Sequence, residues 1–350
     1  IQKTPQIAEK GKETKDNNLI DLVLKLTRSL QPETSHSISL ILLKIAHKLN
    51  LYSFFGISPK FALREPFKFK NLIFKNRLGT AAGLDKNGDY IEALGDLGFG
   101  FLEVGTVTPK PQSGNAKPRV FRFTKERSVI NSLGFNNKGL DHLIKNLKKS
   151  KYDGVLGVNI GANKDSDEKE RIKDYLCCFR GVADYADYIT INISSPNTPG
   201  LRDLHSKENI RELLSKIQNE REKLNFLNPV FLKISPDEGP NTHREIIRSL
   251  IDFNLDGLIA TNTTIQRNSS HNSLIRETDG GLSGELLYEK SNEVLKDIAN
   301  KISHNLLIIA VGGVNSKDSF NHKLNLGASL VQIYTGFIFQ GPKLIKEILR

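Results

Sequence analysis

Methionine and tryptophan are both absent from the 350 residues of this chain, and cysteine occurs only as the adjacent pair Cys177 and Cys178. Adjacent thiols are poorly placed for a structural disulfide, so neither a disulfide framework nor a cysteine-based zinc site is expected. Long hydrophobic runs are also missing. The longest apolar stretch, Ile38 to Ala46, includes Ser39 and Lys44 and falls short of the ~20 residues of a membrane-spanning helix. The first eighteen residues are polar and lack a signal-peptide pattern.

Acidic residues are outnumbered by basic ones. The chain has 50 lysines and arginines against 39 aspartates and glutamates, which gives a formal net charge of +11. This charge favours an anionic partner, such as nucleic acid, phosphate, an acidic substrate or an anionic lipid surface. The basic residues are spread along the whole chain, so an ordinary solvated surface is an equally good explanation. The overall composition is typical of a globular protein.

The first 66 residues differ in pattern from the rest. Residues 1–18 are expected to form a flexible polar tail. Apolar residues then predict one helix from Leu19 to Leu30 and, after a break at Pro32, a second from Glu33 to Lys48. In the second helix Ile38, Ile41, Leu42, Ile45 and Leu49 recur at helical spacing. Residues 19–66 are therefore interpreted as a helical extension with a connector, and residues 67–350 as a separate domain.

Eight short apolar runs with β-forming residues recur in residues 67–350, separated by polar segments of helical character. They are Leu78–Ala82, Phe101–Val107, Val155–Ile160, Tyr188–Ser194, Val230–Ile234, Gly257–Thr261, Leu306–Val311 and Leu330–Tyr334. Continuous rather than alternating hydrophobicity is typical of buried parallel strands. Eight such strands alternating with helices predict an α/β fold, a closed (β/α)₈ TIM barrel with an N-terminal two-helix extension. An open doubly wound sheet is disfavoured because Gly79, Gly83 and Gly88 do not match its glycine fingerprint.

Polar side chains cluster at the predicted carboxyl ends of these strands, where the active site of such a barrel lies. Asparagines are frequent there, and an amide side chain both donates and accepts hydrogen bonds. This suits a ring edge with alternating carbonyl and N–H groups, as in pyrimidines and flavins. No cluster of histidines or carboxylates accompanies them, so a metal site or a paired-carboxylate hydrolase is not expected.

Two further features point to an anionic cofactor. Lys233 lies inside a predicted buried strand, where an unpaired ammonium is costly; a structural ion pair is the alternative explanation. Gly312 and Gly313 follow the seventh strand and Gly336 follows the eighth, which is the usual phosphate site of this fold.

Ten motifs in order resemble those of dihydroorotate dehydrogenases, in particular the membrane-associated class 2 enzymes. They are AAGLDKNG (81–88), EVGTVTPKPQSGNAKPR (103–119), INSLGFNN (130–137), NIGANKD (159–165), INISSPNTPGLR (191–202), LKISPD (232–237), ATNTT (260–264), GGLSG (280–284), VGGV (311–314) and VQIYTGFIFQGP (331–342). The resemblance covers roughly residues 19–350. It implies an FMN-dependent flavoprotein that oxidises dihydroorotate to orotate in pyrimidine biosynthesis and reduces a membrane quinone.

The same resemblance implies a set of site residues. Ser195 corresponds to the catalytic base, and class 1 relatives carry cysteine at this position. The implied FMN contacts are Ala82, Gly83, Lys86, Thr106, Asn159, Asn192, Lys233, Thr261, Gly284, Gly313, Tyr334 and Thr335. The implied dihydroorotate contacts are Lys86, Asn131, Ser132, Leu133, Gly134, Phe135, Asn192, Asn197, Asn262 and Thr263.

In the family, the N-terminal helices form a hydrophobic mouth through which quinone reaches the flavin. Residues 19–49 are accordingly expected to lie on an anionic membrane surface, with Lys25, Arg28, Lys44 and Lys48 facing the headgroups. The alternative is that both helices simply pack on the barrel. Because the polar tail lacks arginine-rich transit-peptide character, the cytoplasmic face of a bacterial inner membrane is expected rather than a mitochondrial inner membrane.

Two other functions remain open at this level. A soluble class 1-type enzyme would reduce fumarate or NAD, but Ser195 in place of cysteine and the 19–49 extension argue against it. A basic nucleic-acid-binding protein would fit the charge, but the sequence has neither an aromatic RNA-binding motif nor a helix-turn-helix signature.

Overall fold

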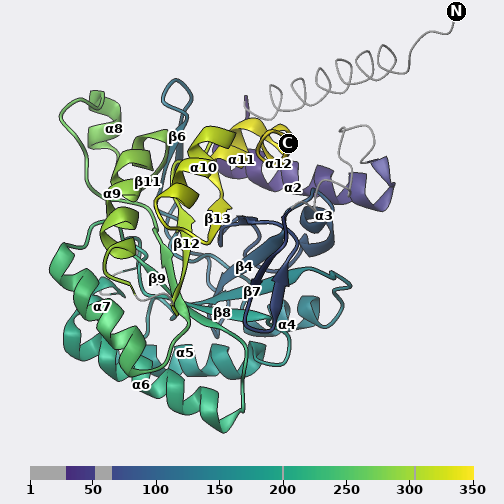
Figure 1. The fold of residues 1–350 in the computed structure, drawn as a ribbon. Coiled ribbons are helices and arrows are strands. Elements are labelled where there is room, and N and C mark those ends of the chain that lie inside the picture. The colour runs from purple at the N-terminus through teal and green to yellow at the C-terminus, as the bar shows by residue number, and fades with distance from the viewer. Residues whose placement is uncertain (1–28, 52–64, 199–200, 303–304) are drawn as a thin grey trace, which may run out of the picture.

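A closed barrel of eight parallel strands forms the centre of the molecule (Figure 1). The computed structural model describes residues 29–51, 65–198, 201–302 and 305–350. The barrel strands are β3 (Leu78–Thr80), β4 (Phe101–Val107), β7 (Val155–Ile160), β8 (Tyr188–Asn192), β9 (Val230–Ile234), β10 (Gly257–Ala260), β12 (Leu307–Val311) and β13 (Leu330–Ile333). Each predicted strand is confirmed to within two residues at either end. β13 pairs with β3, which joins the last strand to the first and closes the barrel.

Helices surround the barrel because each has one apolar face that must be buried. The main ones are α4 (Leu140–Leu147), α5 (Glu168–Val182), α6 (Lys207–Lys223), α7 (Pro240–Asp252), α9 (Tyr288–Ala299), α10 (Lys317–Asn325) and α12 (Pro342–Leu349). Shorter helical segments are α3 (Ile91–Gly95), η3 (Leu201–His205), α8 (Ser273–Glu277), η4 (Glu285–Leu287) and α11 (Thr335–Gln340). α6 shows the pattern well: the Ser206 side chain caps its first turn by accepting from the Asn209 N–H, and Ile210, Leu213 and Ile217 are buried.

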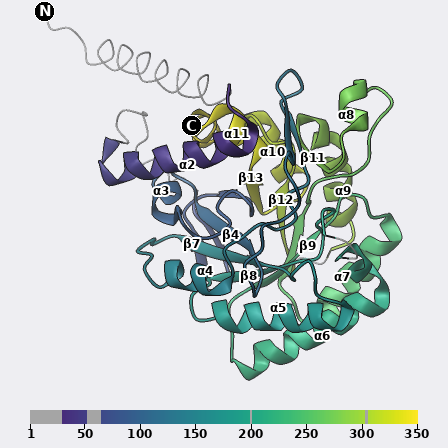
Figure 2. The same ribbon diagram turned by 180° about the vertical axis from the view of Figure 1, so that it is seen from behind.

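The predicted second N-terminal helix is confirmed as α2 (Pro32–Lys48). It lies across one end of the barrel beside α3 and near the C-terminus, as both views show (Figures 1 and 2). The predicted helix from Leu19 to Leu30 lies outside the described residues apart from Ser29 and Leu30. The polar tail, residues 1–18, lies outside them entirely.

Two small antiparallel sheets were not predicted. β1 (Phe67–Phe69) and β2 (Leu72–Phe74) form a hairpin whose Phe74 ring packs edge-on against Phe101, with ring centroids 5.3 Å apart. β5 (Val120–Phe123), β6 (Ser128–Asn131) and β11 (Gly281–Gly284) form a three-stranded sheet. The strands of these two sheets are only three or four residues long, which is too short to give a recognisable alternating pattern in the sequence.

The barrel interior is filled rather than open. Phe101, Tyr188 and Phe231 are fully buried and belong to one apolar cluster inside it. Next to this cluster the buried carboxylate of Glu103 accepts hydrogen bonds from the Asn159 amide at 2.8 Å and the Tyr188 hydroxyl at 2.9 Å. Thr190 and the Gln332 amide also donate to it, at 3.2 and 2.8 Å. This satisfied network supports the side chains above it, at the carboxyl ends of the strands.

The tight interior generates a stability prediction. A Cβ added to Gly79 would lie 2.4 Å from the Phe101 ring, so Gly79→Ala must displace a buried aromatic side chain. We expect it to lower the free energy of unfolding by about 1–3 kcal/mol, the usual cost of overpacking, as measured by urea denaturation. The control is Gly239→Ser, because a Cβ there meets nothing within 4 Å and serine is a good residue at this helix N-cap. An equal loss in both variants would contradict the prediction.

Candidate functional site

A cavity of about 390 Å³ lies at the carboxyl ends of the barrel strands, between the barrel and α2. Its size is in the range of cofactor and substrate pockets. The structure brings all but two of the predicted site residues to its wall. These are Ala82, Gly83, Lys86, Thr106, Asn131, Leu133, Gly134, Phe135, Asn192, Ser195, Asn197, Lys233, Thr261, Asn262, Thr263, Gly284, Gly313, Tyr334 and Thr335.

The two exceptions lie just behind the wall. The Asn159 amide oxygen accepts from Thr106 Oγ1 at 2.6 Å and from Asn192 Nδ2 at 3.1 Å. Asn159 therefore holds the side chains of Thr106 and Asn192, which line the cavity, in place. Ser132 contributes its carbonyl oxygen to a hydrogen bond from Asn115 Nδ2 at 2.8 Å, which holds the adjoining loop in place.

Of the lysines that line the cavity, Lys233 is buried and Lys86 is partly buried. Burial lowers the pKa of Lys233, and the charge of Glu103 acts in the opposite direction. Burial also lowers the pKa of Lys86, to about 8, and its ammonium donates to the Gly83 carbonyl at 3.1 Å. Both groups would gain from an anion placed beside them, because a charge partner offsets the cost of desolvation. In the part of the chain that the structure describes, no group of three His, Cys, Asp or Glu side chains could hold a metal ion.

Bare glycine backbone forms another part of the wall. Gly284 and Gly313 have φ of +94° and +75°, in the left-handed region that glycine tolerates best. A Cβ at Gly313 would lie 2.5 Å from the Tyr288 backbone, and one at Gly284 would lie 2.4 Å from the Arg127 carbonyl. Side chains are excluded at both positions, which line the cavity, and glycine backbone of this kind suits close approach by an anion such as a phosphate.

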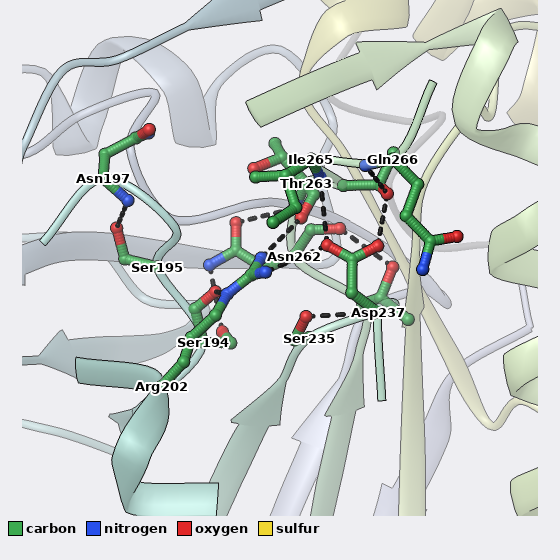
Figure 3. A network of polar contacts seen from close by, with 12 residues as sticks. Ser194, Ser195, Asn197, Arg202, Ser235, Asp237, Asn262, Thr263, Ile265 and Gln266 are labelled. Carbon is green, nitrogen blue, oxygen red and sulfur yellow. Dashed lines mark hydrogen bonds and ion pairs between the residues drawn. The ribbon is translucent and has the colours of Figure 1, made fainter. Parts of the chain in front are cut away.

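Asparagine and serine side chains connect the carboxyl ends of β8 and β10. Asn262 Nδ2 donates to Ser194 Oγ at 2.9 Å, and Ser194 Oγ donates to Asn192 Oδ1 at 2.9 Å. Ser195 is buried, and its hydroxyl oxygen accepts from the backbone N–H of Asn197 at 3.3 Å (Figure 3). Residues 199–200 of the same motif lie outside the described residues.

Three residues at the α2 side of the site were not predicted. Arg119 donates to both carboxylate oxygens of Glu33, at 2.6 and 3.1 Å, and this hydrogen bonding lowers the Glu33 pKa. His36 contacts the Leu84 carbonyl at 3.0 Å through Nε2 and stacks on the Tyr334 ring. Burial, followed by the charge of Lys86, lowers the pKa of His36 to about 4. Only Arg119 could have been noticed in the sequence, since it ends the 103–119 motif.

Comparison with known proteins gives a consistent result. The family model for dihydroorotate dehydrogenase matches residues 66–350. The chain is 46% identical to a dihydroorotate dehydrogenase (quinone) of Marinomonas sp. over 94% of this chain and 95% of the relative. It is 50% identical to the Enterobacter sp. protein of the same name, over 81% of this chain and 86% of the relative. A crystal structure of DHODH from Eimeria tenella in complex with ferulenol has a TM-score of 0.82 and 36% identity, covering 91% of this chain and 89% of that one.

The Glu33–Arg119 pair predicts how α2 is held against the barrel. In Arg119→Met we expect faster amide hydrogen exchange in residues 33–48, because a buried guanidinium that also donates to the Ser113 and Asn115 carbonyls is lost. Hydrogen–deuterium exchange with mass spectrometry measures this. The control is Lys117→Met, since the Lys117 ammonium is also near Glu33, at 3.7 Å, but is 68% exposed. Unchanged exchange in Arg119→Met would mean that other contacts hold the helix.

Proposed function

Because this chain belongs to the dihydroorotate dehydrogenase family, we propose that it oxidises dihydroorotate to orotate in pyrimidine biosynthesis and delivers the electrons through FMN to a quinone. The observation that carries the proposal is one cavity whose lining includes the glycines Gly284 and Gly313, the lysines Lys86 and Lys233, and several asparagines. This combination suits a phosphorylated flavin and a small anionic ring side by side.

FMN fits the residues at the strand ends. Gly284 and Gly313 would receive the phosphate at their backbone N–H groups. Lys233 would lie at the flavin ring and stabilise negative charge there, as a preorganised cation in a dry site does. Gln332 lines the same cavity, and its buried Oε1 has no hydrogen-bond partner within the described part of the chain. Bound FMN supplies the acceptor for the hydride that leaves the substrate.

The remaining polar groups suit dihydroorotate. Lys86 would pair with the substrate carboxylate, while Asn131, Asn192, Asn197 and Asn262 hold the edge of the pyrimidine ring. The Ser195 hydroxyl would remove the proton from C5. A serine is a weak base, so a water-excluding pocket must assist it. The burial of Ser195 and of the neighbouring Thr198 supports this assignment.

The exposed face of α2 supports a role at a membrane surface. Ile41, Leu42, Ile45 and Leu49 are 44–62% exposed, so the apolar side of the helix faces away from the barrel instead of packing on it. The expectation that Lys44 faces lipid headgroups is wrong, because its ammonium donates to the Asp89 carbonyl at 2.7 Å and lies over the Tyr90 ring. No helix in the described segments is both long and apolar enough to cross a bilayer. We therefore propose peripheral attachment through residues 19–49, at the cytoplasmic face of a bacterial inner membrane.

We propose that the electron acceptor reaches the flavin from the α2 side of the cavity. Pro32, Glu33, His36 and Leu40 of α2 line the cavity, so a lipid-soluble acceptor leaving the bilayer would meet the flavin there. The relatives named above are quinone enzymes, which favours quinone over fumarate or NAD. We also propose that the chain is organised as a polar tail (residues 1–18), a helical extension with a connector (residues 19–66) and a barrel domain (residues 67–350).

The central test is an anaerobic titration of the purified protein with dihydroorotate. We expect flavin absorbance near 450 nm to bleach, and then to return on addition of a short-chain quinone but not of fumarate or NAD. The absorbance spectrum records both steps. A colourless protein with no flavin would contradict the assignment, whereas recovery with fumarate or NAD would support the class 1-type alternative.

A second test addresses the proton acceptor. Ser195→Ala is expected to keep FMN bound and to slow flavin reduction by dihydroorotate by about 10²–10⁴-fold, the usual contribution of a positioned base. Stopped-flow absorbance under anaerobic conditions measures the rate constant. Ser283→Ala is a suitable control, because Ser283 also lines the cavity but hydrogen-bonds to Thr335 at 2.9 Å, on the glycine-rich side. Unchanged reduction in Ser195→Ala would remove this residue from the role.

A further inference from the structure

Two charged residues that the proposed chemistry leaves unused meet behind the cavity. Arg202 ends the INISSPNTPGLR motif and Asp237 ends the LKISPD motif, and neither is among the residues that line the cavity. The Arg202 guanidinium donates through Nη1 to Asp237 Oδ2 at 3.0 Å (Figure 3). Their side chains are 19% and 8% exposed, so solvent screens this pair much less than a surface ion pair.

The same guanidinium also contacts two loops that carry site residues. Nε donates to the Ser194 carbonyl at 3.4 Å, and Nη2 donates to the Thr263 carbonyl at 3.2 Å. Ser194 immediately precedes Ser195, and Thr263 immediately follows Asn262. One planar, rigid side chain therefore connects the loop after β8 with the loop after β10. A lysine could not reproduce three divergent contacts of this kind.

Asp237 extends the connection to the loop after β9. Its carboxylate accepts from the backbone N–H of Ile265 at 2.9 Å and from the Thr264 hydroxyl, and the Lys290 ammonium lies 3.5 Å away. The backbone N–H of Asp237 donates to Ser235 Oγ at 3.0 Å. All partners of the carboxylate are donors, which is the arrangement that stabilises a buried charge. The pair thus links the ends of three neighbouring strands (Figure 3).

We propose that Arg202 and Asp237 act together as positioning residues, which fix the Ser195 loop relative to the Asn262–Thr263 loop so that the base and the ring-binding amides face the same substrate. This rests on the function proposed above. The physical reason is that loop ends move independently unless a contact joins them. Displacing a catalytic group by about 1 Å costs up to about 10²-fold in rate. The proposed FMN phosphate contacts at Gly284 and Gly313 are made by other segments, so we expect FMN binding to depend on this link much less than substrate oxidation does.

The test compares the two half-reactions in the FMN-loaded, full-length protein. Arg202→Met is expected to slow flavin reduction by dihydroorotate by about a hundredfold, while reoxidation by a short-chain quinone and the FMN dissociation constant change less than about twofold. Arg202→Lys should recover only part of the rate. Asp237→Asn, which keeps the shape and removes the charge, should also slow reduction. The double variant should be no slower than the slower single one, since residues acting as a unit are not additive.

The matched control is Arg211→Met, which removes an arginine from the Arg211–Asp252 pair, 2.6 Å long and formed between α6 and α7. It should leave both half-reactions unchanged. Normal reduction in the Arg202 and Asp237 variants, additive losses in the double variant, or a parallel loss of FMN binding and quinone reoxidation would each overturn the positioning role. Failure of the proposed function would look different, because dihydroorotate would then not bleach the flavin of the unaltered protein.

Discussion

Closure of eight parallel strands is the constraint on which the rest of this structure depends. The pairing of β13 with β3 makes the first and last strands neighbours, so residues as distant in sequence as Ala82 and Thr335 line one cavity. The strands can end together only because the interior below them is filled, first by Phe101, Tyr188 and Phe231 and then by the hydrogen-bonded Glu103. That carboxylate also influences the site, since its charge raises the pKa of Lys233 against the effect of burial.

Charge within the cavity follows from this architecture. Lys233 lies on a strand buried on both faces, where little water reaches its ammonium group. Lys86, in the loop after β3, is partly buried and its pKa is also lowered. Both groups would interact with an anion more strongly than a surface lysine does. In the proposed function, Gly284 and Gly313 would instead receive the flavin phosphate at backbone groups and not at charged side chains.

Much of this could be predicted from the sequence, for identifiable reasons. Continuous apolar runs marked all eight barrel strands, and local motifs supplied residues that the closed barrel then gathers at one rim. Contacts between distant segments left no comparable signal. Glu33 and Arg119 are 86 positions apart, and Arg202 and Asp237 are 35 apart. Three of these residues end recognisable motifs, but nothing in the sequence indicates which charge is the partner of which. Lys44 was misjudged because helical spacing alone does not tell which face of an amphipathic helix meets the protein.

The placement of α2 has a consequence for engineering. Its inner side is joined to the barrel through Glu33, His36 and Lys44, while its outer side is apolar. Because one side of the helix contacts the barrel and the other is apolar and exposed, α2 is an integral part of the cavity wall. Chimeras that exchange this helix between relatives must therefore exchange the 84–89 loop and Arg119 with it, so that the contacts of the helix to the barrel are kept.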